Sequence, residues 1–572
     1  MKFERGKSLD FPLFLLFIIK INVYFNFHYN VILLLEVILS KGSINVIRKR
    51  SRDLDLTRFK FIMRGLIIGL VVGVIVSLFR FFIEIGLHFV LITYHYIRLH
   101  PFFIVPWMLL MLAISLINSQ LIKKDPDIMG SGIPQVEGQL AGEMDMNWWS
   151  VLWRKWIGGI LSIAVGLFLG REGPSIQLGA AVGQGFAEKT HHKGTGRRVM
   201  IAGGAAAGLS AAFNAPIASS LFVLEEVYHN FSPLIWTTAL SAAIGSDFIS
   251  MNFFGLTPVL HLHYFESFPI KYYFLLIFLG IFLGLLGKLY SYMTLNIDKV
   301  YAKIKWLPRN LDSLVPLMLV IPLGILWPQV LGGGNAIVLG INHYWSSISL
   351  LVILFIVRLV FSTISYGSGL PGGIFLPILT LGAILGALFG KVCVLLGLMP
   401  NCLVINCVIY AMAGYFSCIG KAPFTAILLI TEMVGSLSHL MPLALVSLIA
   451  YTVVDILRGR PIYEAMLDAL LPTPIKEEQL SSFEDEVEIP VFAGSFLQDT
   501  QVRDFKWPKE CLLVAIRRGE KDLIPHGDTV IRSGDTLVIL TSHEKRAWIR
   551  RRIAEIAKAV KKKKQLENFK NK

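Results

Sequence analysis

Three short segments of the sequence place glycine just before a proline, a combination that can present backbone N–H groups to an anion. They are Gly130-Ser131-Gly132-Ile133-Pro134, Gly170-Arg171-Glu172-Gly173-Pro174 and Gly372-Gly373-Ile374-Phe375-Leu376-Pro377. Glycine allows a tight turn and proline is typical of a first helical turn, so each segment predicts the start of a helix. A helix N-terminus carries partial positive charge and free N–H groups, which replace the hydration of an anion without a lysine. For the first and third segments alone, a turn or packing motif is the alternative.

Glu172 is the acidic residue of the second segment and stands between two glycines. A carboxylate at a helix N-terminus mimics the anion that would bind there. Ionised, Glu172 would occupy the place of the anion, and protonated, it would swing away. One residue would then gate anions and carry a proton. The alternative is an ion pair within the loop, between Arg171 and Glu172.

Other polar residues lie beside apolar runs. Glu225 and Glu226 end the run 217–224, and Tyr463 follows the last long hydrophobic segment. An acid near a helix end is commonly a solvated cap, and a tyrosine near a membrane end is commonly an interfacial anchor. The residues alone leave these alternatives open. The five cysteines form no CxxC or Cys/His cluster, so we expect neither a metal site nor a cofactor.

The elements that must position these residues are membrane helices. Of the 572 residues, 54% are hydrophobic and 16% are charged, and the mean hydropathy is +0.63. Soluble domains carry about 25% charged residues, and disordered or fibrous chains are less apolar than this. Apolar segments of about 17–25 residues without strict alternation predict spanning helices rather than barrel strands.

The charge distribution indicates an orientation rather than a partner. Much of the net charge of +15 lies in the last thirty residues, so we expect no nucleic acid partner. A basic run at 48–52 precedes the first strong hydrophobic segment, 61–92. By the positive-inside rule, this places the N-terminal flank in the cytoplasm.

Glycine and proline interrupt the apolar runs, and the interrupted region repeats itself. Segment 130–134 has a glycine-rich counterpart at 332–335, 174–180 matches 377–383, and Asn214-Ala215-Pro216 with Glu225 matches Lys421-Ala422-Pro423 with Glu432. The offsets are 202, 203 and 207 residues, in one order. Duplicated halves with broken helices are typical of transporters that bind their substrate at the repeat interface.

The composition changes after residue 471. Short alternating runs at 487–492, 512–516, 528–531 and 536–540, separated by turn residues, predict strands of a small soluble α+β domain. We therefore expect an N-terminal extension of unknown function (1–57), a transmembrane domain (58–471, in halves of about 58–255 and 256–471), a linker (472–485), the α+β domain (486–555) and a basic tail (556–572).

As a set, the three segments resemble the CLC family of chloride channels and proton-coupled chloride exchangers. GSGIP at 130–134, GREGP at 170–174 and GGIFLP at 372–377 match its signature segments in order and spacing. The resemblance covers about 60–470 and implies an all-α membrane fold of two inverted halves. It also implies a homodimer in which each subunit has its own anion pathway.

The resemblance implies roles for individual residues. Ser131 and Tyr463 would be side-chain ligands of a chloride ion, Gly132 and Ile133 would lie at the same site, and Ile374 and Phe375 would donate backbone N–H groups. Glu172 would be the external gating glutamate, and Glu226 the internal proton-transfer glutamate. Because channels of the family generally lack an acid at that last position, Glu226 favours an exchanger. The one departure, Gln135 after GSGIP, is expected to leave the central site unchanged.

The C-terminal region resembles the TrkA-C (RCK-C) regulatory domain through Pro525-His526-Gly527-Asp528-Thr529 and Ser533-Gly534-Asp535-Thr536-Leu537. This implies regulation of ion transport and a small-molecule regulator. We predict a proton-coupled chloride antiporter in lipid, in a bacterial cell membrane, with the C-terminal domain in the cytoplasm. The alternative is a passive chloride channel of the same fold. A potassium transporter is disfavoured because Thr363-Ile364-Ser365-Tyr366-Gly367 lacks the middle glycine of a filter, and no nucleophile–base pair indicates an enzyme.

Overall fold

The structure, a computed structural model, describes residues 57–558 except for short segments at 230, 257, 261, 263–267, 305–307, 342–346, 472–483, 509–510, 519–520 and 543–544. Residues 1–56 of the predicted N-terminal extension, 472–483 of the predicted linker and 559–572 of the basic tail therefore lie outside the described residues, and the last two residues of that linker belong instead to the first strand of the C-terminal domain.

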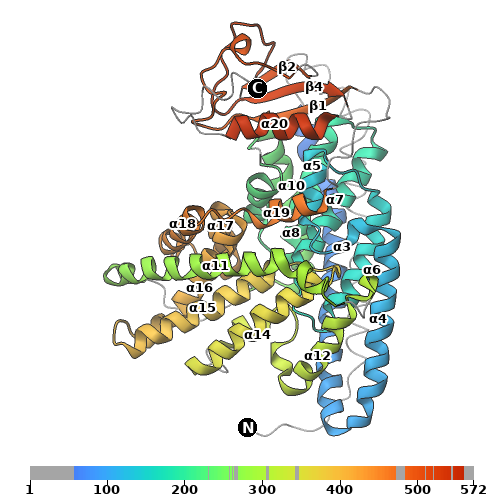
Figure 1. Ribbon diagram of the computed structural model, residues 1–572, viewed down its shortest axis with the longest axis vertical. Helices are drawn as coiled ribbons and strands as arrows, with labels where there is room; N and C mark the ends of the chain where they lie inside the picture. Colours follow the sequence, from blue (N-terminus) through green and yellow to red (C-terminus); the bar gives the residue numbers. More distant parts are fainter. Residues whose placement is uncertain are drawn as a thin grey trace. The chain divides into compact units, whose positions relative to one another are not determined.

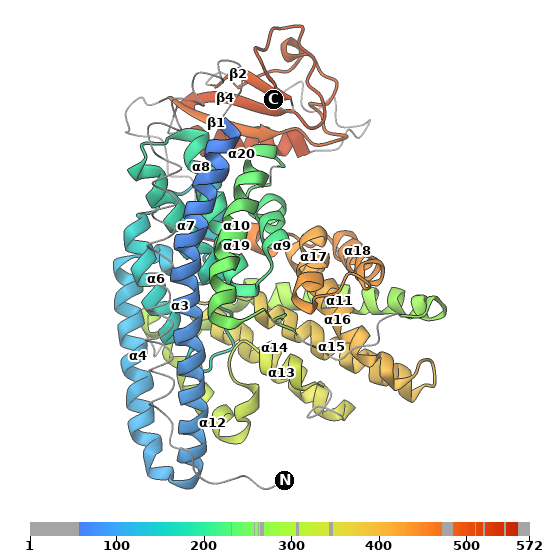
Figure 2. The same cartoon turned by 180° about the vertical axis from the view of Figure 1, so that it is seen from behind.

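The first half of the membrane domain consists of helices interrupted at the predicted glycines and prolines (Figures 1 and 2). Its helices are α3 (Thr57–Leu99), α4 (Ile104–Lys124), α5 (Ile133–Ala141), α6 (Trp148–Ile163), α7 (Glu172–Lys189), α8 (Gly194–Phe213), α9 (Pro216–Phe222) and α10 (Pro233–Phe254). The predicted first span, 61–92, lies within α3.

The second half repeats this pattern of long and short helices. Its helices are α11 (Tyr273–Tyr301), α12 (Leu314–Leu326), α13 (Asn335–Gly340), α14 (Ile348–Gly367), α15 (Phe375–Leu395), α16 (Val404–Gly420), α17 (Pro423–Val434), α18 (Leu440–Ile456) and α19 (Ile462–Leu470). Eight helices of the described residues are long and apolar enough to cross a membrane, whereas α5, α9, α13 and α19 have nine residues or fewer.

Glycines allow the central helix pair of the first half, α7 and α8, to touch backbone to backbone. A side chain at Gly179 would overlap the carbonyl oxygen of Gly204, and a side chain at Gly204 would overlap that of Gly179. In the second half, α15 and α16 pack in the same way through Gly382 and Gly386. Small residues are the usual means of close helix packing in membranes, where the hydrophobic effect does not drive association.

Two acids cross between the halves and cap helices of the other half. Glu225 accepts hydrogen bonds from the N–H groups of Phe424 (3.2 Å) and Thr425 (2.8 Å), at the start of α17. Its counterpart Glu432 accepts from the first N–H groups of α9, at distances of 3.2 and 2.8 Å. Helices α9 and α17 accordingly lie side by side in Figure 2. Glu225 is therefore a helix cap, but it caps a helix of the other half.

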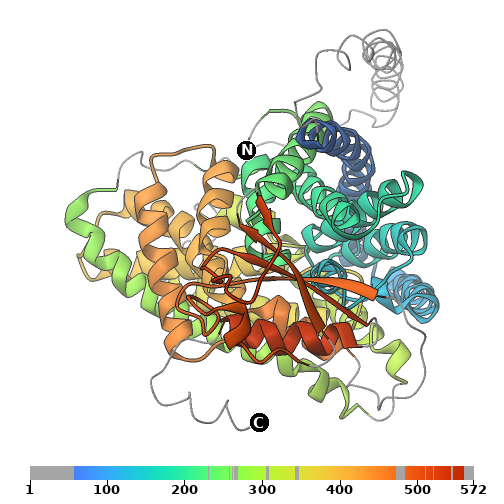
Figure 3. The ribbon, with the colours of Figure 1, turned by 90° about the horizontal axis from the view of Figure 1, so that it is seen from above.

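The C-terminal domain is a four-stranded antiparallel sheet covered by one helix (Figure 3). Its strands are β1 (Glu484–Pro490), β2 (Cys511–Arg518), β3 (Lys521–Leu523) and β4 (Thr536–Ser542), in the order β1-β4-β2-β3, and α20 (Arg546–Lys558) packs on β1. The strands interdigitate with α20 around an apolar core of their own that includes Val487, Ile539, Ile549 and Ile553.

One predicted strand is wrong and one strand was missed. Residues 528–531 form only an isolated bridge between Gln501 and Val530. Turn-forming side chains occupy both ends of this stretch: Thr529 accepts from the His526 N–H (2.9 Å), and Asp535 accepts from the Arg532 N–H (2.7 Å). The short β3 instead completes a hairpin with β2.

The α7–α8 contact predicts a sharp difference between adjacent glycines. Gly204→Ala would drive a methyl group into backbone that cannot move alone, so we expect a cost of about 1–3 kcal/mol. Gly203→Ala is the matched control, because its Cβ would lie 3.5 Å from the nearest atom, an ordinary contact. Thermal unfolding in detergent should show a lowered midpoint for Gly204→Ala alone. Equal midpoints for the two variants would refute the close-packing explanation.

Candidate anion and proton site

The three predicted segments meet at the centre of the membrane domain. The N–H of Gly170 donates to the carbonyl of Gly373, and the N–H of Gly373 donates to that of Gly170, both at 2.7 Å. The N–H of Gly372 donates to the carbonyl of Gly130 at 3.0 Å. Segments more than two hundred residues apart in the chain are thus joined directly through their backbones.

The hydrogen bonds around this junction occur in pairs that are related by the sequence repeat. Gly130 donates to the carbonyl of Gly369 (3.3 Å), and its counterpart Gly332 donates to that of Gly166 (2.9 Å). The bridge between Gly170 and Gly373 pairs two positions that are themselves 203 residues apart. A contact that is unchanged when its partners are exchanged lies on a two-fold axis. The two halves therefore meet at their pseudo-symmetry axis.

Two buried cations that we did not predict hold the broken backbone in place. Lys155 Nζ donates to the carbonyls of Ile128 (2.9 Å) and Gly130 (2.8 Å), and the side chain is fully buried. Arg358 donates in the same way to the carbonyls of Val330, Gly332 (2.8 Å) and Gly333. Lys155 and Arg358 are 203 residues apart, so the repeat offset is the sequence signal that could have revealed them.

Ser131 begins the first of the predicted helix N-termini. Its hydroxyl is buried and has no hydrogen-bond partner among the described residues. Gly132 caps α5 at φ 94°, a conformation that favours glycine, and Ile133 and Pro134 form the first turn. Ser131 packs against Gly173, where any side chain would collide with its hydroxyl. Ser131 of the first segment therefore requires the glycine of the second segment.

The third segment starts α15 beside the same place. Ile374 caps the helix and Phe375 is its first residue, with Pro377 in the first turn. The Phe375 ring packs against that of Phe416, with centroids 4.3 Å apart, and is fully buried. This packing fixes the direction in which the N-terminal amides of α15 point.

Glu172 is the first residue of α7 and is fully buried. The charge of Arg171 and the N–H group of Leu376, at the start of α15, both act electrostatically on its carboxylate. The alternative of an ion pair confined to the loop is not supported, because the Arg171 guanidinium bonds to Glu84 on α3 at 2.7 Å. The acid thus lies where the N-termini of α7 and α15 meet.

Tyr463 lies inside the domain rather than at its border. The side chain is fully buried near the start of α19, and its hydroxyl has no hydrogen-bond partner among the described residues. The ring is within electrostatic reach of both Glu172 and Glu226. The alternative of an interfacial anchor is therefore excluded by its burial.

Glu225 and Glu226 lie on a single π-helical turn, Val223–Val227, and point to different surroundings. Glu225 caps α17, whereas Glu226 is 3% exposed. Glu226 is within electrostatic reach of Glu137, whose Oε1 lies 3.4 Å from His229 Nε2. Turns of this kind are frequent at functional sites, and here the turn separates a structural acid from a buried one.

The arrangement offers neutral donors and movable acids rather than a fixed charge. Two unpaired hydroxyls, from Ser131 and Tyr463, and the N–H groups at the start of α15 can coordinate an anion. Glu172 and Glu226 can carry protons. Among the described residues, no group of three or more histidine, cysteine, aspartate or glutamate residues is placed to hold a metal ion.

These features define a class of protein: a multi-pass membrane protein of two related halves, with broken helices that converge on a buried polar site. The chain belongs to the voltage gated chloride channel family, whose profile matches residues 110–455. A TrkA-C domain profile matches residues 486–553. Both resemblances predicted from the sequence are confirmed.

The chain is similar to known bacterial exchangers over most of their length. A Vibrio campbellii protein described as H(+)/Cl(-) exchange transporter ClcA is 32% identical over 436 residues, which cover 74% of this chain and 92% of that protein. A Salmonella gallinarum protein of the same description is 31% identical over 397 residues, covering 67% of this chain and 83% of that protein.

Solved structures share the fold. The crystal structure of a slow cyanobacterial Cl−/H+ antiporter matches with a TM-score of 0.68 at 28% identity, over 72% of this chain and 98% of that one. A CLC-type fluoride/proton antiporter, at 20% identity and a TM-score of 0.56, shows the fold alone.

Replacing the two buried cations, Lys155 and Arg358, should have different effects in the two halves. Lys155→Met leaves two carbonyls beside Ser131 without a donor, at about 1–3 kcal/mol for each buried group, so we expect halide affinity to fall about tenfold. Isothermal titration calorimetry with chloride measures this. Arg358→Met is the matched control, because it acts on the segment around Gly332, which lacks a hydroxyl ligand, and should lower stability with affinity nearly unchanged. Equal affinities for the two variants would contradict the assignment.

Proposed function

We propose that this protein moves chloride across a membrane in exchange for protons, as an H+/Cl− antiporter. The observation that supports the proposal is the direct backbone hydrogen bonding between the segments that carry Ser131, Glu172 and the start of α15, beside buried hydroxyls of Ser131 and Tyr463 that have no partner among the described residues. The descriptions of its relatives as exchangers support it, and they favour exchange over a passive channel.

Chloride would bind between α5, α15 and α19. The hydroxyls of Ser131 and Tyr463 would donate to it from one side, and the N–H groups of Ile374 and Phe375 from the other. Gly132 and Ile133 would bring the start of α5 close to the ion. Because each donor is neutral, the ion is stabilised without the tight binding that a lysine in contact would cause. We also propose that the protein holds no integral cofactor.

Protons would use the two buried acids. Glu172 would leave the anion position when it is protonated and return when it is ionised, which links the movement of a proton to that of an anion. Glu226 would exchange protons with the opposite side. Tyr463, which is influenced by both acids, would lie between the two proton positions.

The assembly and its location complete the proposal. The protein would be a homodimer with one anion pathway in each subunit, in a bacterial cell membrane. The C-terminal domain would lie in the cytoplasm and respond to a small molecule. The basic run at 48–52 supports this orientation by the positive-inside rule.

Replacing Glu226 tests the coupling. Glu226→Gln removes the titratable group, so a chloride gradient across vesicles should no longer drive protons, while chloride flux continues. Glu225→Gln is the control, since that adjacent acid caps α17 and should leave coupling intact. Proton movement is followed with a pH electrode and chloride with a silver chloride electrode. Full coupling in Glu226→Gln would reject its role, and uncoupled chloride flux in the wild type would reject exchange.

Replacing Glu172 tests the gate. Glu172→Gln mimics the protonated acid, so chloride flux should lose its pH dependence, whereas flux through the wild type should rise as the acid is protonated over about two pH units. Glu188→Gln, at the far end of the same helix, should behave as the wild type does. A steep pH dependence that persists in Glu172→Gln would show that another group gates the ion.

A further inference from the structure

The short helix α5 connects the candidate site to the face on which the C-terminal domain lies. It begins beside Ser131 and ends at Gly142. The next residue, Glu143, is bound to the last turn of α5, because its N–H donates to the carbonyl of Gly138 at 2.7 Å. A helix rises 1.5 Å per residue, so about 13 Å separates the two ends. A displacement of Glu143 would therefore move the short helix α5, whose N-terminus lies beside Ser131.

The other short helix, α19, has the same design. Tyr463 is in its first turn and Asp468 is in its last turn. The two helices pack tightly, since a Cβ at Gly138 would lie 2.8 Å from Leu467 Cδ1. Each helix thus has a candidate anion ligand at one end and a carboxylate at the other.

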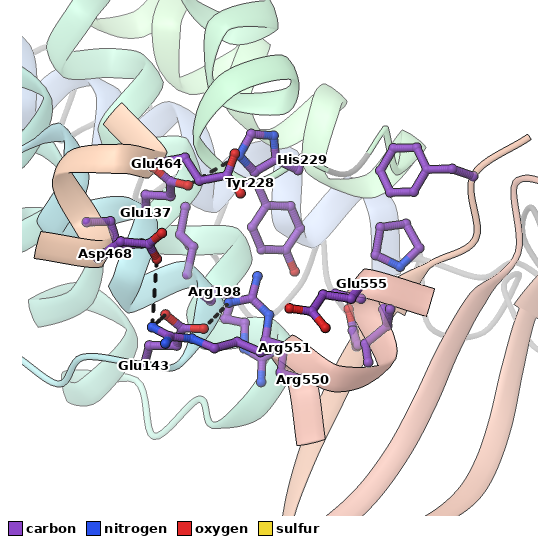
Figure 4. Close-up of a pocket in the computed structure, with 18 of the residues that line it drawn as sticks. Glu137, Glu143, Arg198, Tyr228, His229, Glu464, Asp468, Arg550, Arg551 and Glu555 are labelled. Carbon is purple, nitrogen blue, oxygen red and sulfur yellow. Dashed lines mark hydrogen bonds and ion pairs between the residues drawn. The ribbon is translucent and has the colours of Figure 1, made fainter. Parts of the chain in front are cut away.

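Helix α20 of the C-terminal domain contacts both carboxylates (Figure 4). Arg550 Nη1 lies 3.6 Å from Glu143 Oε1, and Arg551 Nη2 lies 3.7 Å from Glu143 Oε2. The same Arg551 nitrogen lies 3.9 Å from Asp468 Oδ1. Glu143 is only 8% exposed, so these guanidiniums compensate a carboxylate with little access to water. Arg551 therefore contacts a carboxylate near the C-terminal end of each of the two helices, α5 and α19.

Neighbouring contacts keep α20 in this register. The guanidinium of Arg546 lies against Gly142, where any side chain would overlap it. Thr195, at the start of α8, donates to Glu488 on β1 at 2.7 Å. A hydrogen bond from Arg460 to Asp468 raises the pKa of the Arg460 guanidinium, so Asp468 binds cations from both domains.

The two docked domains also line a partly open pocket of about 350 Å³. Glu137 and His229 line it on the membrane side, and Arg550, Arg551 and Glu555 line it on the other (Figure 4). His229 follows Glu226 by three residues. The C-terminal domain therefore lies over Glu137, which is within electrostatic reach of the buried acid Glu226.

We infer that Arg550 and Arg551 are positioning residues for anion transport, which act through Glu143 and Asp468 on the helices that carry Ser131 and Tyr463. Partly exposed ion pairs contribute little to the free energy that holds two domains together. Here they join the C-terminal domain to the ends of the two helices that present hydroxyls to the ion. Movement of α20 therefore changes the geometry of the site. This inference rests on the proposed function.

The test uses the full chain in vesicles and the variant Arg550→Gln/Arg551→Gln. Losing the ion pairs should raise the apparent KM for chloride about threefold with a smaller change in kcat, because partly exposed ion pairs contribute modestly. Raising ionic strength with potassium gluconate should raise the KM of the wild type by screening, but not that of the variant. Glu143→Gln should have a similar effect, and combining it with the arginine changes should add little.

Controls separate positioning from general damage. Arg503→Gln/Arg532→Gln removes two exposed arginines of the same domain and should leave KM and its salt dependence unchanged, and Arg550→Lys/Arg551→Lys should restore most of the wild-type KM. Amide hydrogen exchange in α5 and α19 should rise only in the glutamine variant. Unchanged KM and exchange in that variant, or a loss of kcat alone, would overturn the inference. If vesicles with the wild-type protein move no chloride, the proposed function is rejected instead. Amide hydrogen exchange would then still show whether the arginines stabilise α5 and α19.

Discussion

The free energy of removing water from a small anion is the constraint on which the rest of this structure depends. A bare charge in a low-dielectric interior costs tens of kcal/mol, yet a lysine in contact would hold the ion too tightly for transport. In the proposed site, helix N-termini and hydroxyls would solve this problem, but they require helices that break inside the membrane. A broken helix leaves carbonyls without partners. Lys155 and Arg358 satisfy those carbonyls, so both buried cations serve the backbone.

Duplication lets one design solve the problem twice. The bridge between Gly170 and Gly373 lies on the pseudo-symmetry axis, and the cations and helix caps are repeated on either side of it. The symmetry is broken where chemistry is needed: Ser131 follows the first glycine of its segment, whereas Gly333 takes the corresponding place in the other half. The scaffold is therefore shared by both halves, and the polar side chains of the site are not.

Sequence alone predicted the parts of the site that local geometry dictates. Ser131, Glu172 and Phe375 lie one or two residues after a glycine, at or next to a helix start as the motifs predict, and their roles in the site stay predictions. Lys155 was missed because one cation in an apolar run has no local pattern, and its partners are carbonyls that any residue supplies. The strand error at 528–531 has a related cause: alternation was visible, but the side-chain hydrogen bonds that shorten the segment were not. Contacts of α20 with the membrane domain depend on docking, which no spacing encodes.

The exchange of caps by Glu225 and Glu432 bears on how such a chain arises and matures. The first amides of α9 can bond to the Glu432 carboxylate only after residue 432 has been synthesised, so the first half cannot complete its own helix start. A single half, as an ancestor before duplication, would meet the same need only by pairing with an inverted copy of itself. In this chain the corresponding contact lies within one polypeptide.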